Sequence, residues 1–260
     1  MTPGNGALHM TIPAAFNGPD GSGNGGYGAG LLARHLTSVG GPVVQVTLRA
    51  PLPLDRELVV AADDEEALRL VDPTIEDPRD RARLVAEAVR VDSFDQEVIP
   101  GGPVSMSEAE KASRLYPGLT DHPFPRCYSC GPERAEGEGL RLFPGQVLPG
   151  EGPSNVGNTV ACTWRVLPAT DDGTGHAAFE QVWAALDCPG GWSHDIKGRP
   201  ILLGRFTAQV LRVPEVGTTQ VVMGRLRSVD GRKVHTDSAL YDADGVLFAQ
   251  ARATWIAIRS

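Results

Sequence analysis

The residue best placed to do chemistry is Asp187, in a predicted helix of the second half of the chain. That helix has apolar residues at i, i+3, i+4 and i+7, which form one face that must pack on a sheet: Phe179, Val182, Trp183 and Leu186. The Cys-Pro-Gly-Gly-Trp run at 188–192 predicts that the helix ends at Asp187. Large apolar neighbours would raise the pKa of this carboxyl group and suit it to act as a general base. The simpler interpretation is a local hydrogen bond between Asp187 and the glycine turn that follows.

Two further polar residues lie on the same side of this helix if the helix begins by residue 176. His176 and Glu180 fall within about 40° of Asp187 at 100° per residue. At a rise of 1.5 Å per residue, His176 and Asp187 are about 16 Å apart along the axis. They cannot act on the same atom.

The elements that would position these residues occur twice in the chain. Arg49-Ala50-Pro51 closes an apolar run at 43–48, and Arg212-Val213-Pro214 closes a similar run at 201–211. The second arginine and proline lie 163 residues after the first pair. A glycine-rich, helix-forming stretch precedes each run, at 23–39 and 173–192. The sequence therefore predicts a duplicated unit of one helix and an antiparallel sheet, an α+β fold.

Alternating apolar and polar residues predict the strands. We expect an edge strand at 10–16 and further strands at 43–50, 57–62, 67–71, 84–91, 139–143, 159–166, 201–211, 220–226, 233–241 and 246–258. The Asp-Gly pairs at 230–231 and 244–245 are typical of hairpin turns. Asn24 or Ser22 can cap the first helix, and a short capped helix is expected at 107–112.

These elements divide the chain into three parts. We expect an N-terminal module at 1–92, a crossover linker with the short helix at 93–126, and a C-terminal module at 127–260. A unit of about 100–150 residues buries enough apolar surface to fold without disulfides.

Composition excludes several classes of function. The chain has 260 residues, a net charge of −8 and scattered arginines, which argues against nucleic-acid binding. No stretch approaches 18 uninterrupted apolar residues, so we expect neither a membrane span nor secretion. The four cysteines are irregularly spaced, which favours free thiols in a reducing compartment. We expect a cytoplasmic protein.

Short motifs over nearly the whole chain resemble the double-hotdog proteins of the acyl-CoA thioesterase superfamily. The runs at 127–131 and 139–143 are similar to the Cys-x-x-Cys-Gly and Gly-Leu-x-x-x-Phe opening of many hotdog thioesterases. Asn-Gly-Gly-Tyr at 24–27 resembles the His-Gly-Gly entry to the hotdog helix, with Asn where His is common. Ala-Ala-Leu-Asp at 184–187 is similar to the segment that carries the catalytic carboxylate in several members.

The resemblance implies two tandem hotdog modules, each an antiparallel sheet wrapped around a central helix, and hydrolysis of an acyl thioester such as acyl-CoA, with no cofactor. In such enzymes a carboxylate on one module's helix is the base or nucleophile, so Asp187 would activate water. Amides at the start of the other module's helix polarise the carbonyl, and the turn of Asn24, Gly25 and Gly26 has such unpartnered N–H groups. We expect Thr207 and Gln209, on the polar face of the next strand, to orient the water.

Departures from the pattern limit the activity to one site at most. The first helix has Ala33 and Arg34 where a matching carboxylate would lie, and His-Ala-Ala at 176–178 replaces the double glycine in the second half.

The resemblance also implies contacts for the substrate. Coenzyme A carries phosphates, for which Arg205 and Arg212 are the expected partners, with Lys197 and Arg199 nearby. Tyr27 and Trp192 are expected to contact the acyl group. Trp183 and Phe206 could line the same tunnel.

Several alternatives stay open. A non-catalytic acyl-CoA or acyl-chain binding protein would keep the tunnel without turnover. A hydratase or dehydratase would need a His-Asp pair closer than His176 and Asp187. The Cys127 and Cys130 pair could bind zinc only with His122, Cys162 or Cys188, and we expect a structural turn with no metal. The two modules form an internal pseudo-dimer, and a homodimer is a further option.

Overall fold

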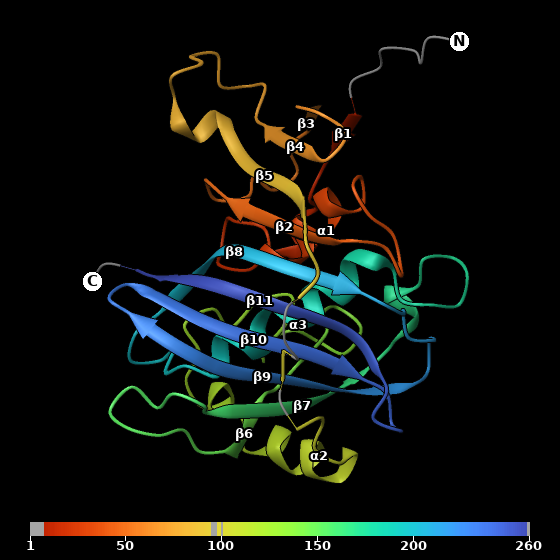
Figure 1. Cartoon of the computed structure of the whole chain (residues 1–260), viewed down its shortest axis with the longest axis vertical. Coiled ribbons are helices and arrows are strands. Elements are labelled where there is room, and N and C mark those ends of the chain that lie inside the picture. The colour runs from red at the N-terminus through yellow and green to blue at the C-terminus, as the bar shows by residue number, and fades with distance from the viewer. Residues whose placement is uncertain (1–7, 95–97, 100, 259–260) are drawn as a thin grey trace.

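The protein is described by a computed structural model over residues 8–94, 98–99 and 101–258. In this part of the chain, eleven strands form one continuous antiparallel sheet that curves around helices α1 and α3 (Figure 1). The spatial order is β1-β3-β4-β5-β2-β8-β11-β10-β9-β7-β6. The strands are β1 (Leu8–Met10), β2 (Val43–Leu48), β3 (Leu58–Ala62), β4 (Ala67–Val71), β5 (Leu84–Val91), β6 (Gly145–Leu148), β7 (Thr159–Arg165), β8 (Ile201–Val210), β9 (Thr219–Asp230), β10 (Lys233–Tyr241) and β11 (Leu247–Ala257). The helices are α1 (Gly25–Ala33), α2 (Met106–Arg114) and α3 (Phe179–Trp192).

The sheet has an internal pseudo-twofold arrangement. Strands β2 and β8 pair at its centre, with Val44 opposite Ala208 and Val46 opposite Phe206. Outward from this seam, the order β5-β4-β3-β1 on one side matches β11-β10-β9-β7 on the other. One helix belongs to each half. The structure confirms the α+β class and the two tandem hotdog modules.

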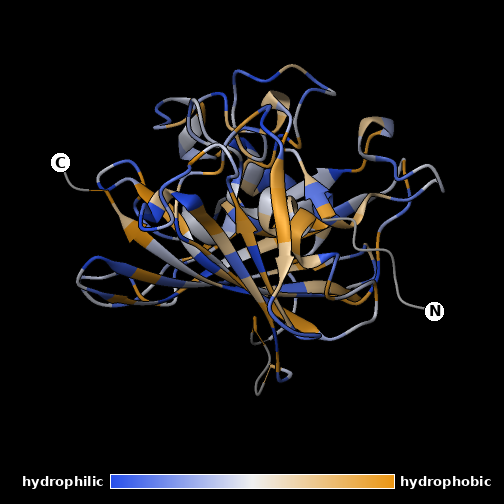
Figure 2. Ribbon diagram, turned by 90° about the horizontal axis from the view of Figure 1, so that it is seen from above, coloured by the Kyte–Doolittle hydropathy of each residue, from blue (hydrophilic) through white to orange (hydrophobic). Residues whose placement is uncertain are grey.

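The strands follow the predicted pattern closely where apolar and polar residues alternate. The predictions for 67–71, 84–91 and 233–241 match β4, β5 and β10 residue for residue. Burial alternates along β11, and Figure 2 shows the matching change of hydropathy along the strands. The apolar face of the sheet covers the two helices.

Two predicted strands differ from the structure. The edge strand β1 ends at Met10, and residues 14–16 form a 3-10 turn, since Pro13 has no N–H to continue a ladder. Residues 139–143 are not a strand, because Arg141 has a positive φ of 52°. Their amides at Leu140 and Leu142 bond instead to the carbonyls of Tyr128 and Ser129.

Helix α1 is shorter than predicted and lies close to α3. Asn24 caps it, because its side-chain oxygen accepts a hydrogen bond from the amide of Tyr27. The two helices approach so closely that a Cβ on Gly26 would lie 2.6 Å from the carbonyl oxygen of Trp183. A Cβ on Gly30 would lie 2.8 Å from Cα of Glu180. Glycines therefore set the crossing of α1 and α3.

Helix α3 does not end at Asp187, contrary to the prediction. It continues through Pro189 to Trp192, although proline cannot donate to the carbonyl four residues earlier. Hydroxyl groups from outside the helix supply hydrogen bonds to its carbonyls: Ser129 Oγ donates to Ala184 and Ser238 Oγ donates to Leu186. Asp187 therefore lies inside the helix with a fixed orientation.

The segment between the modules carries α2, which packs on β6 and β7. Its cap is Ser105, which forms a capping box with Glu108, so the helix begins before the predicted residue 107. None of the helices in the described ranges has the length and apolar character needed to span a membrane.

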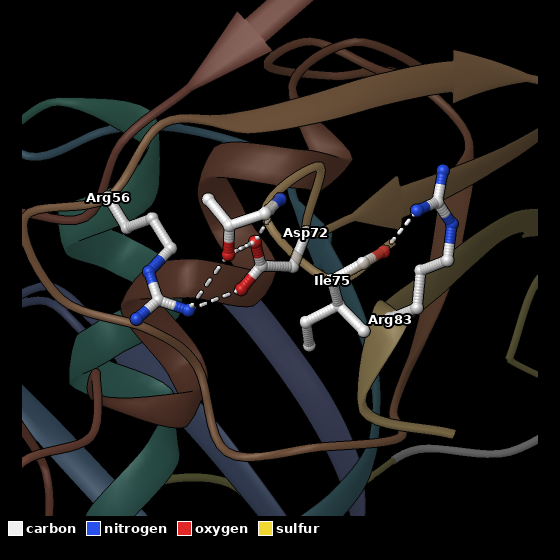
Figure 3. A network of polar contacts seen from close by, with 5 residues as sticks. Arg56, Asp72, Ile75 and Arg83 are labelled. Carbon is white, nitrogen blue, oxygen red and sulfur yellow. Dashed lines mark hydrogen bonds and ion pairs between the residues drawn. The ribbon is translucent and has the colours of Figure 1, made fainter. Parts of the chain in front are cut away.

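A polar network holds the β4–β5 connection at the outer edge of the first module (Figure 3). The buried Asp72 carboxylate accepts hydrogen bonds from Arg56 Nη1 at 2.6 Å and from the amide and hydroxyl of Thr74. Arg83 donates to the carbonyl of Ile75. Burial tends to raise the pKa of Asp72, but these hydrogen bonds outweigh it and lower the pKa.

Candidate functional site

A cavity of about 580 Å³ lies where the two modules meet. One wall comes from the first module, through the loop at 18–25 and the end of β2. The opposite wall comes from the second half of α3, the start of β8 and the end of β11. Residues of the inter-module segment, including His122 and Phe124, complete it. Its volume is that of a typical small-molecule site.

Asp187 lies in the cavity wall and binds the other module's helix. Its Oδ2 accepts a hydrogen bond of 2.9 Å from the backbone N–H of Gly26, in the first turn of α1. The side chain is buried, and within the described residues Oδ1 has no hydrogen-bond partner. Burial raises the pKa of this carboxyl group to about 7, against the lowering effects of the Gly26 hydrogen bond and of the nearby Asn24 side chain. The simpler interpretation was a local hydrogen bond between Asp187 and the turn at 190–191. The structure instead shows Asp187 hydrogen-bonded to the other module.

The glycine turn of the first module faces this carboxylate. Asn24 and Gly25 both line the cavity. As the first residue of α1, Gly25 has no intrahelical acceptor for its N–H, and the part of the chain that the structure describes offers it no other. Gly26 differs, because Asp187 already occupies its N–H. The N–H of Gly26, expected to hold an oxyanion, instead donates to Asp187, whereas the N–H of Gly25 has no acceptor among the described residues.

Three thiols and a histidine form part of the same cavity wall. Cys127 and Cys188 approach to 3.7 Å between their sulfur atoms, and Cys130 lies 3.4 Å from Nε2 of His122. Hydrogen bonds from the Cys130 and Cys188 thiols hold the pKa of Cys127 well below its usual range. From the sequence, the Cys127 and Cys130 pair is expected to be a structural turn, with His122, Cys162 or Cys188 as the possible further ligands, and the fold brings Cys188 to the pair.

Thr207 and Gln209 do not reach the cavity. The pairing of β8 with β11 shifts between Leu203 and Arg205, which leaves Gly204 as a bulge. Beyond the bulge the buried, inward residues are Phe206, Ala208 and Val210. Thr207 and Gln209 therefore face away from the helices, and the predicted role in orienting water is wrong for both.

The expected phosphate partners are also displaced. Arg205 lies on the outer face beyond the same bulge, 3.3 Å from the hydroxyl of Thr47, and Arg212 is exposed after the end of β8. Neither lines the cavity. The cation in the cavity wall is Arg49, which is half-exposed and paired with Glu87. Sequence analysis singled out Arg49 as a repeat marker and missed this position.

Of the two aromatic residues expected to contact the acyl group, one lines the cavity and the other does not. Trp192 lines the cavity, as does Trp255, which the sequence analysis did not identify. Tyr27 is buried on the far side of its helix, where it stacks on Phe16 at 3.9 Å between ring centroids. Tyr27 is therefore a core residue, and the substrate contact predicted for it is corrected.

A second junction of α1 and α3 lies at the pseudo-symmetric position. There Arg34 pairs with Glu180 at 3.5 Å, in place of a glycine amide and an aspartate. His176 lies in the loop before α3, 3.3 Å from the hydroxyl of Thr174, and so is outside the helix. The expectation of one competent site at most agrees with this asymmetry.

Solved structures with the same arrangement match almost the full length of the chain. A conserved protein of unknown function with a hot dog fold from Alicyclobacillus acidocaldarius aligns with a TM-score of 0.60 and 13% identity, over 99% of this chain and 95% of that one. A candidate thioesterase from Novosphingobium aromaticivorans gives 0.59 and 12%, over 97% and 96%. The tesB protein of Mycobacterium avium subs paratuberculosis gives 0.55 and 12%, over 97% and 93%. No family model matches the chain, and no curated protein matches its sequence. The chain therefore has the double-hotdog fold and thioesterase-like structural relatives.

Proposed function

We propose that the protein hydrolyses an acyl thioester, such as acyl-CoA, in the cavity between its two modules. One observation carries the proposal. The Asp187 carboxylate is held by the amide of Gly26 from the other module, its second oxygen has no hydrogen-bond partner among the described residues, and the residue lines an apolar cavity. In a carboxylate held in this way, one oxygen fixes the orientation of the group and the other can accept a proton from water.

The chemistry follows from these two oxygens. A water bound at Oδ1 gives a proton to Asp187 as its oxygen attacks the thioester carbonyl carbon. The carbonyl oxygen gains negative charge, which the N–H of Gly25 at the start of α1 stabilises. The carbon–sulfur bond then breaks, and the leaving thiolate takes the proton back from Asp187. The products are a carboxylic acid and a free thiol.

The lining of the cavity supports an acyl group as the substrate. Apolar side chains from both modules and the inter-module segment contribute to it: Leu52, Phe124, Trp192, Ile201, Leu203 and Trp255. Arg49, which also pairs with Glu87, is the cation at the same wall that an anionic head group such as the phosphates of coenzyme A would meet. The candidate thioesterase among the full-length structural relatives agrees with this substrate class.

The test is thiol release from a panel of acyl-CoA esters of increasing chain length, for wild type and Asp187→Asn. The asparagine oxygen can still accept from Gly26, so the fold is kept while the base is lost. We expect at least one ester to be cleaved and Asp187→Asn to be slower by about 10²–10⁴-fold. Asp237→Asn is the matched control, since Asp237 is also buried with a pKa raised by burial to about 6, but lies on β10 away from the cavity.

The binding-protein alternative has its own outcome in this experiment. Saturable binding of acyl-CoA by calorimetry without thiol release from any ester would contradict hydrolysis. Full activity in Asp187→Asn would contradict the role of the carboxylate.

A further inference from the structure

The cysteine cluster in the cavity wall has the composition of a metal site. The sulfur atoms of Cys127, Cys130 and Cys188 all lie within 4.8 Å of one another, and the Cys127–Cys188 separation is 3.7 Å. All three residues are buried. They come from two distant parts of the chain, the turn at 127–131 and the second half of α3. The fold thus brings together three thiols that have no role in the proposed hydrolysis.

The separations fit a tetrahedral zinc ion. A Zn–S bond of about 2.3 Å at tetrahedral angles places neighbouring sulfur atoms about 3.8 Å apart. The 3.7 Å between Cys127 and Cys188 already matches this value. A disulfide would use two of the three sulfur atoms and leave the third unexplained, whereas a metal ion uses all three.

The turn that carries the first two thiols is built to hold a thiolate. The side-chain amide of Asn24 approaches the Cys127 sulfur to 3.8 Å and donates toward it. Gly131 keeps the turn tight, because a Cβ there would lie 2.5 Å from the carbonyl oxygen of Pro125. Such outer hydrogen bonds orient metal-bound sulfur and stabilise its charge.

The fourth position points to the cavity. His122 is the nearest candidate, but its Nδ1 accepts a hydrogen bond from the amide of Phe124 at 2.9 Å. That bond assigns the ring proton to Nε2, which then donates to the Cys130 sulfur at 3.4 Å. His122 therefore supports a thiolate as a donor, and the fourth ligand is left to water, because Cys127, Cys130 and Cys188 all line the cavity.

We propose that Cys127, Cys130 and Cys188 bind one Zn²⁺ ion, with the fourth coordination position open to water in the inter-module cavity. Binding releases the thiol protons, and no electron transfer is involved. The site goes beyond the proposed hydrolysis and does not depend on it. It also replaces the expectation that the Cys127 and Cys130 pair is only a structural turn without a metal.

Metal analysis of the full-length protein, purified without chelators, tests the proposal without any activity assay. We expect one zinc per chain by mass spectrometry, and X-ray absorption with three sulfur neighbours at about 2.3 Å and one oxygen. Cys127→Ser and Cys188→Ser should lose the zinc. Cys162→Ser is the matched control, because Cys162 is a buried cysteine in β7 outside this cluster, and it should retain the zinc.

A titration of wild type covers the case in which the serine variants fail to fold. Reduced, metal-free protein should take zinc from a chromophoric chelator, and Co²⁺ should give thiolate-to-metal charge-transfer absorption. Fully reduced wild type that takes up neither ion would overturn the proposal. So would a zinc ion without sulfur neighbours, or zinc that is retained in Cys188→Ser and lost in Cys162→Ser.

Discussion

The two junctions between α1 and α3 occupy pseudo-equivalent positions but have opposite chemistry. At one, the Gly26 amide donates to a buried carboxylate beside a cavity, and Asp187 keeps a free oxygen. At the other, Glu180 is neutralised by the half-exposed guanidinium of Arg34. Duplication supplies two similar crossings that differ in charge pairing: Glu180 is paired with a cation, whereas Asp187 has no ion-pair partner among the described residues.

The largest effect is expected from closing the gap between the helices at the first junction. In Gly26→Ala the new methyl group would lie 2.6 Å from the Trp183 carbonyl oxygen and 2.7 Å from Cβ of Asp187. We expect hydrolysis to fall about 100-fold, because a shift of about 1 Å in a catalytic group costs that much, and stability to fall by about 1–3 kcal/mol. Thiol release measures the rate of hydrolysis, and chemical denaturation measures the free energy of unfolding.

Gly30→Ala is the matched variant at the second junction, where the new methyl group would lie 2.8 Å from Cα of Glu180. It should lose similar stability but less than about tenfold in rate, since the Gly26–Asp187 contact is kept. Equal losses of rate in the two variants would show that the junctions do not differ.

An effect of intermediate size is expected for the cap of α1. Asn24→Ala removes the acceptor for the Tyr27 amide and should cost about 1 kcal/mol of stability. Because α1 then loses its fixed start beside the cavity, we expect thiol release to fall about tenfold. Ser105→Ala removes the cap of α2, far from the cavity, and should lose similar stability with unchanged rate. A similar loss of rate in both variants would show that reduced stability, and not the position of α1 beside the cavity, slows hydrolysis.

A smaller effect is expected for the cation on the cavity side. Arg49→Gln should raise KM for acyl-CoA by about three- to tenfold with kcat nearly unchanged, since it weakens binding of the phosphates and leaves the base in place. Arg69→Gln is its control, a paired arginine on β4 that does not line the cavity. A fall in kcat without a change of KM would show that Arg49 does not bind the head group.

The smallest effect concerns stability at the second junction. Glu180→Gln should change the free energy of unfolding by less than about 1 kcal/mol, because the partner Arg34 is half-exposed and the pair is screened by water. Urea denaturation of wild type and variant measures this difference. A loss of several kcal/mol would show a structural role for the pair that its exposure does not suggest.

Local patterns predicted the elements of this fold, and long-range contacts decided the site. The alternation in β4, β5 and β10 and the Asn24 cap are properties of neighbouring residues, so the sequence was enough for them. The carbonyls of Ala184 and Leu186 in α3 accept hydrogen bonds from the hydroxyls of Ser129 and Ser238, which are distant in sequence. No local signal predicts them.

The errors at the site have the same origin. Thr207 and Gln209 lie on the polar face of β8, as the alternation indicates, but beyond the Gly204 bulge this face points away from the helices and from the cavity. The third thiol of the cysteine cluster could not be assigned from the Cys-x-x-Cys spacing. Cys188 lies on α3, and only the packing of α3 against the turn at 127–131 brings its sulfur to the other two.

The most direct test of the account compares the carboxylates of the two junctions in one assay. Thiol release from the best acyl-CoA substrate should be measured for wild type, Asp187→Asn and Glu180→Gln, with substrate affinity followed separately by calorimetry. The account predicts a loss of about 100-fold or more for Asp187→Asn at unchanged affinity, and a rate within about twofold of wild type for Glu180→Gln. Wild-type turnover in Asp187→Asn, or an equal loss in both variants, would contradict it.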